Sequence, residues 1–223
     1  MAGDALLTVR RAAKFYGQKL VFKEVSCSVG PGEILLVAGH NGAGKSTLMR
    51  IMAGLSRPSA GEVELHVEPE RAAYLGHATF LYPGLSARAN LRFWATMYGL
   101  SPSEAEISAL LARVGLEKAA EEKAGSFSRG MAQRLNLARI YLVAPELIFL
   151  DEPGTGLDPR SLATLRREIA GFRERGTGVV WISHHVAEDA ALADTVLALG
   201  GQKVQYFGPS EGYLKTLDEE GAC

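Results

Sequence analysis

The sequence predicts an α/β fold with a mostly parallel sheet, antiparallel strands near the N-terminus and an inserted helical subdomain. Short apolar runs typical of buried strands lie at residues 34–38, 147–150 and 179–182. A glycine-rich loop joins the first run to a helical pattern, and strand patterns are nearly absent between residues 87 and 144. We therefore expect a core of residues 1–75 and 145–223, with a helical subdomain of residues 76–144 inserted between its halves.

The composition is that of an ordinary globular domain. The chain has 223 residues, of which 47% are apolar and 22% charged, enough to bury a core. Its formal net charge of −1 gives no overall attraction to nucleic acid, so we expect no nucleic-acid partner. No apolar run approaches the length of a membrane span, and residues 1–9 lack the pattern of a signal peptide, which favours a cytoplasmic location. Cys27 and Cys223 fit no disulfide or metal-binding pattern, and we expect no disulfide.

Two strands are expected at the start of the chain. Residues 7–12 and 21–29 have strand character, with a break near Gly17. Tyr16 stands beside this break, and two interpretations of it are open. An aromatic residue next to a turn usually packs against the core, which the residue alone favours, whereas an exposed one ahead of a phosphate-binding loop could stack on a purine ring.

The glycine-rich loop at residues 39–47 has the pattern Gly-x4-Gly-Lys-Ser directly behind an apolar strand. Such a loop curls so that its N–H groups surround a phosphate, its lysine reaches the β- and γ-phosphates, and its serine hydroxyl ligates Mg²⁺. The helix that follows points its N-terminus at the same anion. The alternative, a chance match in a chain with 25 glycines, is disfavoured by the strand and helix on either side. The sequence predicts a P-loop NTPase core, with a nucleotide bound by Gly39, Asn41, Gly42, Gly44, Lys45, Ser46 and Thr47.

Ionisable side chains follow the other two buried strands. In an open parallel sheet, ligands bind at the carboxyl ends of the strands. Asp151 would hold Mg²⁺ there, directly or through water, and Glu152 would polarise an attacking water molecule. In isolation an exposed acidic turn would be the better interpretation, but the phosphate loop reverses that preference. For His184, a contact with the γ-phosphate is favoured over zinc, because no cysteine or carboxylate lies nearby at ligand spacing.

Further patterns place helix ends and a hairpin. A helix is expected from residue 87 to residue 98, and another with Ser101 as its N-cap and the following proline as its first residue. Asp158 is the expected N-cap of a helix that also begins with proline. Residues 196–207 contain a Gly-Gly pair between strand patterns and predict a hairpin.

Residues 126–134 form a serine-capped helix start about twenty residues before the Asp151–Glu152 pair. Together with the phosphate loop, this arrangement resembles ATP-binding-cassette (ABC) transporter ATPases over almost the whole chain. The resemblance implies ATP hydrolysis with ATP and Mg²⁺, and a head-to-tail homodimer or paired cassette around two ATP molecules. It also implies that the helical subdomain carries the motion to transmembrane transporter subunits, at the inner face of the cell membrane.

The same resemblance implies roles within one subunit. Tyr16 matches the aromatic residue that stacks on adenine, and Lys45 matches the phosphate-loop lysine. Asp151 matches the Mg²⁺-associated acid and Glu152 the catalytic residue that polarises water. His184 matches the switch histidine that senses the γ-phosphate.

Other matched positions point to a second subunit. Ser128 and Gly130 resemble signature residues that contact the ATP held by the opposite subunit, and Asp158 belongs to a loop that resembles the one crossing the dimer interface. Two departures stand out. Met131 replaces the glutamine that usually ends the signature, and His77 stands where the family usually has a glutamine that touches Mg²⁺ and water. We expect catalytic activity to depend on His77.

Within the family, residues 74–77 and 127–131 are most similar to haem-exporter ATP-binding subunits used in cytochrome c maturation. A general drug or polysaccharide exporter subunit is the first alternative. A soluble cassette ATPase that acts on nucleic acid or ribosomes is disfavoured, because the chain has neither a long coiled-coil insertion nor a second cassette. A GTPase is disfavoured by the Asp-Glu pair, the signature and the absence of an Asn-Lys-x-Asp motif.

Overall fold

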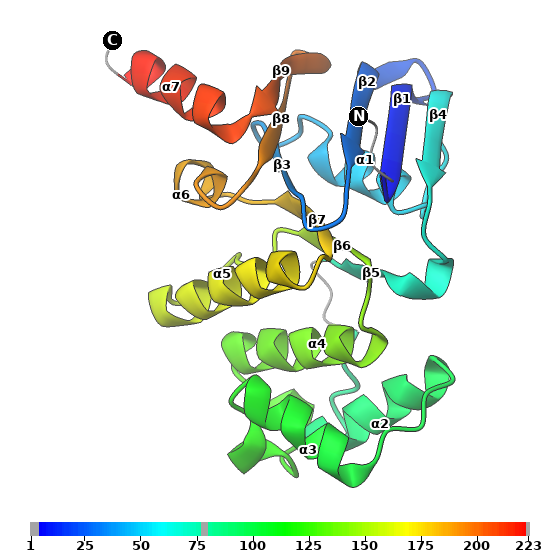
Figure 1. Ribbon diagram of the computed structural model, residues 1–223, viewed down its shortest axis with the longest axis vertical. Coiled ribbons are helices and arrows are strands. Elements are labelled where there is room, and N and C mark those ends of the chain that lie inside the picture. Colours follow the sequence, from blue (N-terminus) through cyan, green and yellow to red (C-terminus); the bar gives the residue numbers. More distant parts are fainter. Residues whose placement is uncertain (1–4, 77–79, 222–223) are drawn as a thin grey trace.

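A six-stranded sheet runs through the centre of the structure, a computed structural model that describes residues 5–76 and 80–221 (Figure 1). Its strand order is β5-β6-β7-β3-β8-β9, and the strands pair in parallel except for the antiparallel pair β8 and β9. The mostly parallel sheet and the closing hairpin are thereby confirmed. The strands are β3 Ile34–Ala38, β5 Ala72–Leu75, β6 Leu147–Asp151, β7 Gly178–Ile182, β8 Thr195–Gly200 and β9 Lys203–Pro209.

The central strands are covered on both faces. Every residue of β3, β6 and β7 is buried. Ile34 and Leu36 of β3 belong to a core cluster shared with the helices on one face, whereas Leu35 and Val37 belong to a cluster on the other face. Strands whose side chains alternate between two dry faces are mostly apolar, which explains the continuous apolar runs; the buried Asp151 at the end of β6 is the exception.

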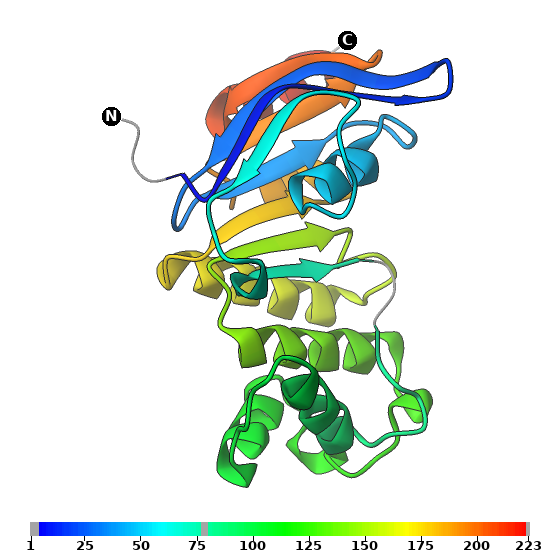
Figure 2. The same ribbon diagram turned by 90° about the vertical axis from the view of Figure 1, so that its right-hand side faces the viewer.

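The second sheet is antiparallel, has the order β2-β1-β4 and lies beside the central sheet (Figures 1 and 2). Its strands are β1 Leu7–Tyr16, β2 Lys19–Val29 and β4 Ala60–Leu65. The predicted break is the tight turn at Gly17, whose φ of 59° suits glycine. Strand β1 continues to Tyr16, four residues beyond its expected end at residue 12. The expected N-terminal antiparallel strands are confirmed.

Helices pack on both faces of the central sheet. Helix α1 (Lys45–Met52) buries its apolar residues against the face shared with the N-terminal sheet, and α5 (Pro159–Glu174) covers the other face. Asp158 is the N-cap of α5, as predicted, and its side chain accepts a hydrogen bond from the N–H of Ser161. The described residues also form helices α6 (Val186–Ala190) and α7 (Ser210–Gly221), and 3-10 helices at Pro69–Arg71, Glu117–Ala119 and Ala124–Ser126.

Three helices form the end of the molecule farthest from the N-terminal sheet (Figure 2). They are α2 (Ala87–Met97), α3 (Glu104–Arg113) and α4 (Arg129–Val143), and they pack against one another. The start predicted for α2 agrees with the structure. The exact limits of the inserted subdomain, residues 76–144, stay a prediction. Within residues 5–76 and 80–221, no helix has the length and apolar character needed to cross a membrane.

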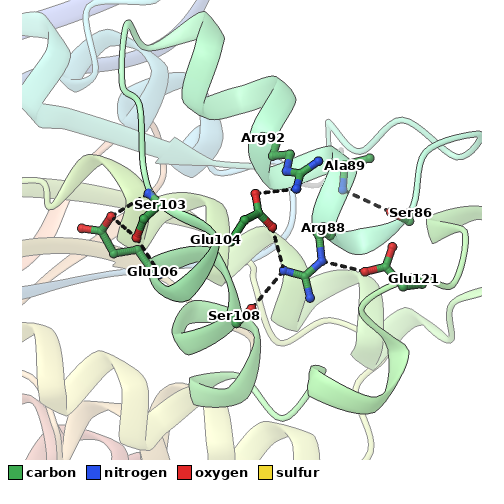
Figure 3. A network of polar contacts seen from close by, with 9 residues as sticks. All are labelled: Ser86, Arg88, Ala89, Arg92, Ser103, Glu104, Glu106, Ser108 and Glu121. Carbon is green, nitrogen blue, oxygen red and sulfur yellow. Dashed lines mark hydrogen bonds and ion pairs between the residues drawn. The ribbon is translucent and has the colours of Figure 1, made fainter.

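The N-cap expected for α3 was wrong by two residues. The cap is Ser103, not Ser101 (Figure 3). The Ser103 hydroxyl accepts a hydrogen bond from the N–H of Glu106, and the N–H of Ser103 donates to the Glu106 carboxylate at 2.7 Å. A glutamate stands three residues after Ser101 as well as after Ser103, so the sequence pattern fits both serines, and the reciprocal pair forms at Ser103. The hydrogen bonds from Ser103 lower the pKa of Glu106.

A charged network ties α2 to α3 and to the segment after it (Figure 3). Arg88 of α2 donates to Glu121 at 2.6 Å and to the Ser108 hydroxyl at 3.0 Å. It also pairs with Glu104, the first residue of α3, which in turn contacts Arg92. A single exposed ion pair contributes little to the stability of the fold. Several ion pairs that share one guanidinium hold the segments they join in fixed relative positions.

Candidate nucleotide-binding site

Three neighbouring strands deliver the predicted site residues to one edge of the central sheet. The phosphate loop follows β3, Asp151 and Glu152 stand at the end of β6, and His184 follows β7. Because β6, β7 and β3 are adjacent and parallel, their carboxyl ends meet. A cavity of about 700 Å³ lies there, and it is lined by Tyr16, Lys19, Leu20, Val21, residues 40–47, Glu152, His184, Gly201 and Gln202.

The conformation of the phosphate loop depends on its glycines. Gly39, Gly42 and Gly44 have φ values of 137°, 83° and 100°, which other residues rarely adopt. A side chain at Gly39 would also collide with the main-chain oxygen of Leu199. At Gly44, a Cβ atom would lie 2.8 Å from Val21 Cγ1. The glycines therefore permit both the curl of the loop and its close contact with neighbouring strands.

Lys45 is a buried cation at the first turn of α1. Its Nζ donates to the main-chain oxygens of Gly39 at 2.8 Å and His40 at 3.1 Å. These acceptors are neutral, so they satisfy the ammonium group without cancelling its charge. A buried positive charge beside a helix N-terminus strongly favours a bound anion such as a phosphate.

Asp151 lies at the floor of the site and is only 1% exposed. Its Oδ1 accepts a hydrogen bond from the Ser46 hydroxyl at 2.9 Å, and its Oδ2 accepts one from the Tyr74 hydroxyl at 2.9 Å. Burial and the neighbouring carboxylate raise the pKa of Tyr74 to about 12, so its hydroxyl stays a donor at neutral pH. The serine and aspartate oxygens are hard ligands of the kind that Mg²⁺ prefers beside phosphates, so this donor set fits Mg²⁺.

Glu152 and His184 contact each other. His184 Nε2 lies 2.6 Å from Glu152 Oε2. A carboxylate only accepts hydrogen bonds, so the proton is on Nε2. The Glu152 main chain has a φ of 55°, unusual for a residue other than glycine, and its N–H donates to the Ile182 oxygen at 3.1 Å. Such strained positions cluster at functional sites, where the surrounding structure fixes them.

The segment that carries His184 is held by buried polar contacts. The Ser183 hydroxyl donates to the buried Asp189 and accepts from the N–H of His185 at 3.0 Å. Asp189 also receives a hydrogen bond of 2.6 Å from Arg166 of α5. In the described part of the chain, no cluster of three or more His, Cys, Asp or Glu side chains is arranged to hold a metal ion.

Tyr16 is 59% exposed and stands at the rim of the cavity. The packing interpretation that the residue alone favoured is therefore wrong. Lys19, at the start of β2, and Gln202, in the turn between β8 and β9, line the same cavity, and sequence reasoning missed them because polar residues are common in and beside turns. His77 lies outside the described residues.

Ser128, Gly130 and Asp158 lie together but outside this cavity. A serine cap was predicted within residues 126–134, and the structure places it at Ser128, the N-cap of α4, whose hydroxyl accepts from the N–H of Met131 at 3.2 Å. A Cβ atom at Gly130 would lie 3.0 Å from the Ser161 hydroxyl and 3.9 Å from Asp158 Oδ2. Hydrogen bonds from Ser161 lower the pKa of Asp158. Within one chain, these three residues do not line the cavity that contains the phosphate loop.

Comparison with known proteins identifies the family. Residues 22–155 match the ABC transporter family. The chain is 38% identical to the cytochrome c biogenesis ATP-binding export protein CcmA of Methylococcus capsulatus, over 83% of this chain and 94% of that protein. It is 34% identical to the linearmycin resistance ATP-binding protein LnrL of Bacillus subtilis, over 86% of this chain but 65% of that protein.

A solved structure agrees with these sequence matches. It is described as an ATP-binding subunit of an ABC transporter, has 28% sequence identity and superposes with a TM-score of 0.83, covering 96% of this chain and 93% of that chain. The α/β fold with its phosphate loop is thereby confirmed. The chain belongs to the ABC transporter family, as an ATP-binding subunit that hydrolyses ATP.

Proposed function

We propose that Lys45, Glu152 and His184 carry out ATP hydrolysis in the cavity at the ends of β3, β6 and β7. The convergence of these side chains in one cavity is the observation that carries the proposal. The phosphate-loop N–H groups and Lys45 bind the β- and γ-phosphates. Tyr16 stacks on the adenine ring at the rim.

Mg²⁺ fits beside Ser46 and Asp151. The chemistry that the ion supplies when bound is neutralisation of charge on the phosphate oxygens. Ser46 and Asp151 would hold it, with the remaining ligands coming from phosphate and water. Their hydrogen bond, 2.9 Å long, keeps the two oxygens side by side before nucleotide binds.

Glu152 is the proposed general base, and His184 controls when it is available. Without nucleotide, the carboxylate accepts the N–H of His184. A γ-phosphate oxygen in the cavity is a competing acceptor for the same N–H. When His184 turns to the phosphate, the Glu152 carboxylate is released to accept a proton from the attacking water.

Two copies of the chain are proposed to complete each other's site. Ser128 and Asp158 are exposed, and the N-terminus of α4 behind Ser128 offers unpaired N–H groups to an anion. Since these groups do not line the cavity of their own chain, a head-to-tail partner would present them to the ATP held by the phosphate loop.

The catalytic proposal is tested by Glu152→Gln, which keeps the shape of the side chain but removes its basicity. We expect ATP affinity near that of the wild type, turnover about a hundredfold or more lower, and ATP-dependent accumulation of dimers. The measurements are steady-state phosphate release, nucleotide binding and size-exclusion chromatography. Glu146→Gln, just before the opposite end of the same strand, is the matched control and should keep its turnover. Wild-type turnover in Glu152→Gln would remove this residue from the mechanism.

Membrane subunits of the transporter are proposed to dock on the helical end of the molecule. An aromatic cluster there links Phe80, Tyr82, Phe93, Trp94 and Tyr98, with ring centroids of Tyr82 and Phe93 4.3 Å apart. Phe80, Tyr82 and Tyr98 are exposed, as are Met97 and Leu100 nearby. Exposed apolar groups gathered in one place favour a protein partner, and docking there would hold the chain at the inner face of the membrane.

Export of haem for cytochrome c maturation is the proposed transport function. It is supported by the similarity to CcmA over 83% of this chain and 94% of that protein. Export of another substrate, as for the resistance protein LnrL, is the second candidate. Deletion of the gene for this protein should abolish covalent haem in c-type cytochromes, measured by haem staining. Complementation with the wild-type gene should restore the haem, and complementation with Glu152→Gln should not. Normal cytochrome c without the chain would contradict haem export and leave the ATPase assignment intact.

A further inference from the structure

The Asp151 carboxylate is fixed from two sides. Each oxygen accepts one hydrogen bond of 2.9 Å, Oδ1 from Ser46 and Oδ2 from Tyr74. The terminal torsion of an aspartate is soft, so a single hydrogen bond would leave the carboxylate free to turn. A buried carboxylate oxygen without a donor is also costly. Together with the Ser46 hydroxyl, the Tyr74 hydroxyl therefore fixes the orientation of the carboxylate plane.

Tyr74 is itself anchored on both sides of its strand. Strand β5 lies at the edge of the central sheet and pairs with β6, where Tyr74 stands opposite Phe149. From the other side, Arg139 of α4 donates to the Tyr74 main-chain oxygen at 3.4 Å. Arg139 is only 6% exposed, and it also donates to the Tyr98 hydroxyl at 2.7 Å. A tyrosine held in this way presents its hydroxyl from a fixed position.

We propose that Tyr74 is a positioning residue that orients the Asp151 carboxylate for Mg²⁺. The inference rests on the proposed role of Asp151 as a Mg²⁺ ligand. Tyr74 does not line the nucleotide cavity, and its hydroxyl reaches the metal site through the Asp151 carboxylate. Its effect should therefore appear in the affinity for Mg²⁺ and not in the affinity for nucleotide without metal.

The test is Tyr74→Phe, which removes one oxygen atom and keeps the ring. We expect the dissociation constant for Mg²⁺, titrated into the protein with saturating ATP and followed by the thermal unfolding midpoint, to rise about tenfold. The affinity for ATP in EDTA should stay at the wild-type value, because the phosphate loop is untouched. Steady-state hydrolysis should regain most of the wild-type rate at high Mg²⁺.

Tyr141→Phe is the matched control. Tyr141 of α4 also donates a hydrogen bond to a carboxylate, that of Glu168, but at the contact of α4 with α5 and away from the cavity. Loss of this hydrogen bond should lower the free energy of unfolding and leave the Mg²⁺ dissociation constant unchanged. An unchanged constant in Tyr74→Phe, or an equal rise in both variants, would overturn the inference. If ATP binding by the wild type does not depend on Mg²⁺, the proposed role of Asp151 as a Mg²⁺ ligand is wrong. The role inferred for Tyr74 is then wrong as well.

Discussion

At the residue scale, the reactive groups of the site are held by partners that a nucleotide can replace. Lys45 donates to two main-chain oxygens, and His184 donates to Glu152. Phosphate oxygens are stronger acceptors than neutral carbonyl groups, because the hydrogen bonds they accept from an ammonium are charge-assisted on both sides. Lys45 and His184 thus have acceptors without nucleotide, and we expect nucleotide binding to exchange these contacts for contacts with phosphate.

Stacking by Tyr16 is a prediction at this scale. Tyr16→Ala should weaken ATP binding by about five- to a hundredfold, because stacking a base on an aromatic ring contributes about 1–3 kcal/mol. Tyr16→Phe should bind nearly as well as the wild type, since the ring remains. The measurement is equilibrium titration with ATP.

Phe15→Ala provides the control for this prediction. Phe15 is also exposed, but in a β-strand it points to the opposite face from Tyr16, and it does not line the cavity. ATP affinity should be unchanged in this variant. Equal losses in Phe15→Ala and Tyr16→Ala would show that the strand, and not stacking, is responsible.

The sequence predicts a site residue well when the residue stands beside a local pattern. The phosphate loop, Asp151 and His184 could be found because each follows an apolar strand directly. Tyr74 could not be found this way. Its hydroxyl reaches Asp151 across 77 residues of chain, and the contact depends on the parallel pairing of β5 with β6. Such partners become visible only when strand order is known.

At the element scale, buried strands were predicted more reliably than helix ends. A strand covered on both faces has one pattern, a continuous apolar run, and β3, β6 and β7 all show it. The start of α3 was ambiguous, because Ser101 and Ser103 both precede suitable helical residues. The hydrogen bonds between Ser103 and Glu106 resolve that ambiguity.

The cap of α3 gives a prediction at this scale. Ser103→Ala should lower the free energy of unfolding by about 1 kcal/mol, measured by denaturant titration, because an N–H at the helix start loses its acceptor. The pKa of Glu106 is lowered in the folded state. The stability that the ionised Glu106 side chain contributes through the cap is therefore present above the ordinary pKa of glutamate. It is lost as the pH falls through the lowered pKa of Glu106. Ser101→Ala is the control, and a greater cost there would contradict the assignment of the cap.

At the scale of the whole molecule, the nucleotide cavity and the signature residues lie on separate surfaces of one chain. The cavity with the phosphate loop lies at one edge of the central sheet, and the signature residues lie at the start of α4, next to α5. The aromatic cluster lies on and beside α2, in the helical end of the molecule. The sequence indicated the phosphate loop and the signature residues, but not the aromatic cluster, and the separation of these parts follows from the packing of α4 against the core. This separation is why we propose that a second copy completes the site.

The most direct test of this proposal mixes two variants that are each inactive. Lys45→Ala removes the phosphate-loop charge, and Ser128→Arg blocks the signature. In a head-to-tail mixed dimer, one site carries both lesions and the other carries neither. If subunits exchange at random, half of the dimers are mixed and half of their sites are intact, so ATP hydrolysis should return to about a quarter of the wild-type rate. A mixture as inactive as each variant alone, with both variants folded by circular dichroism, would contradict the shared site.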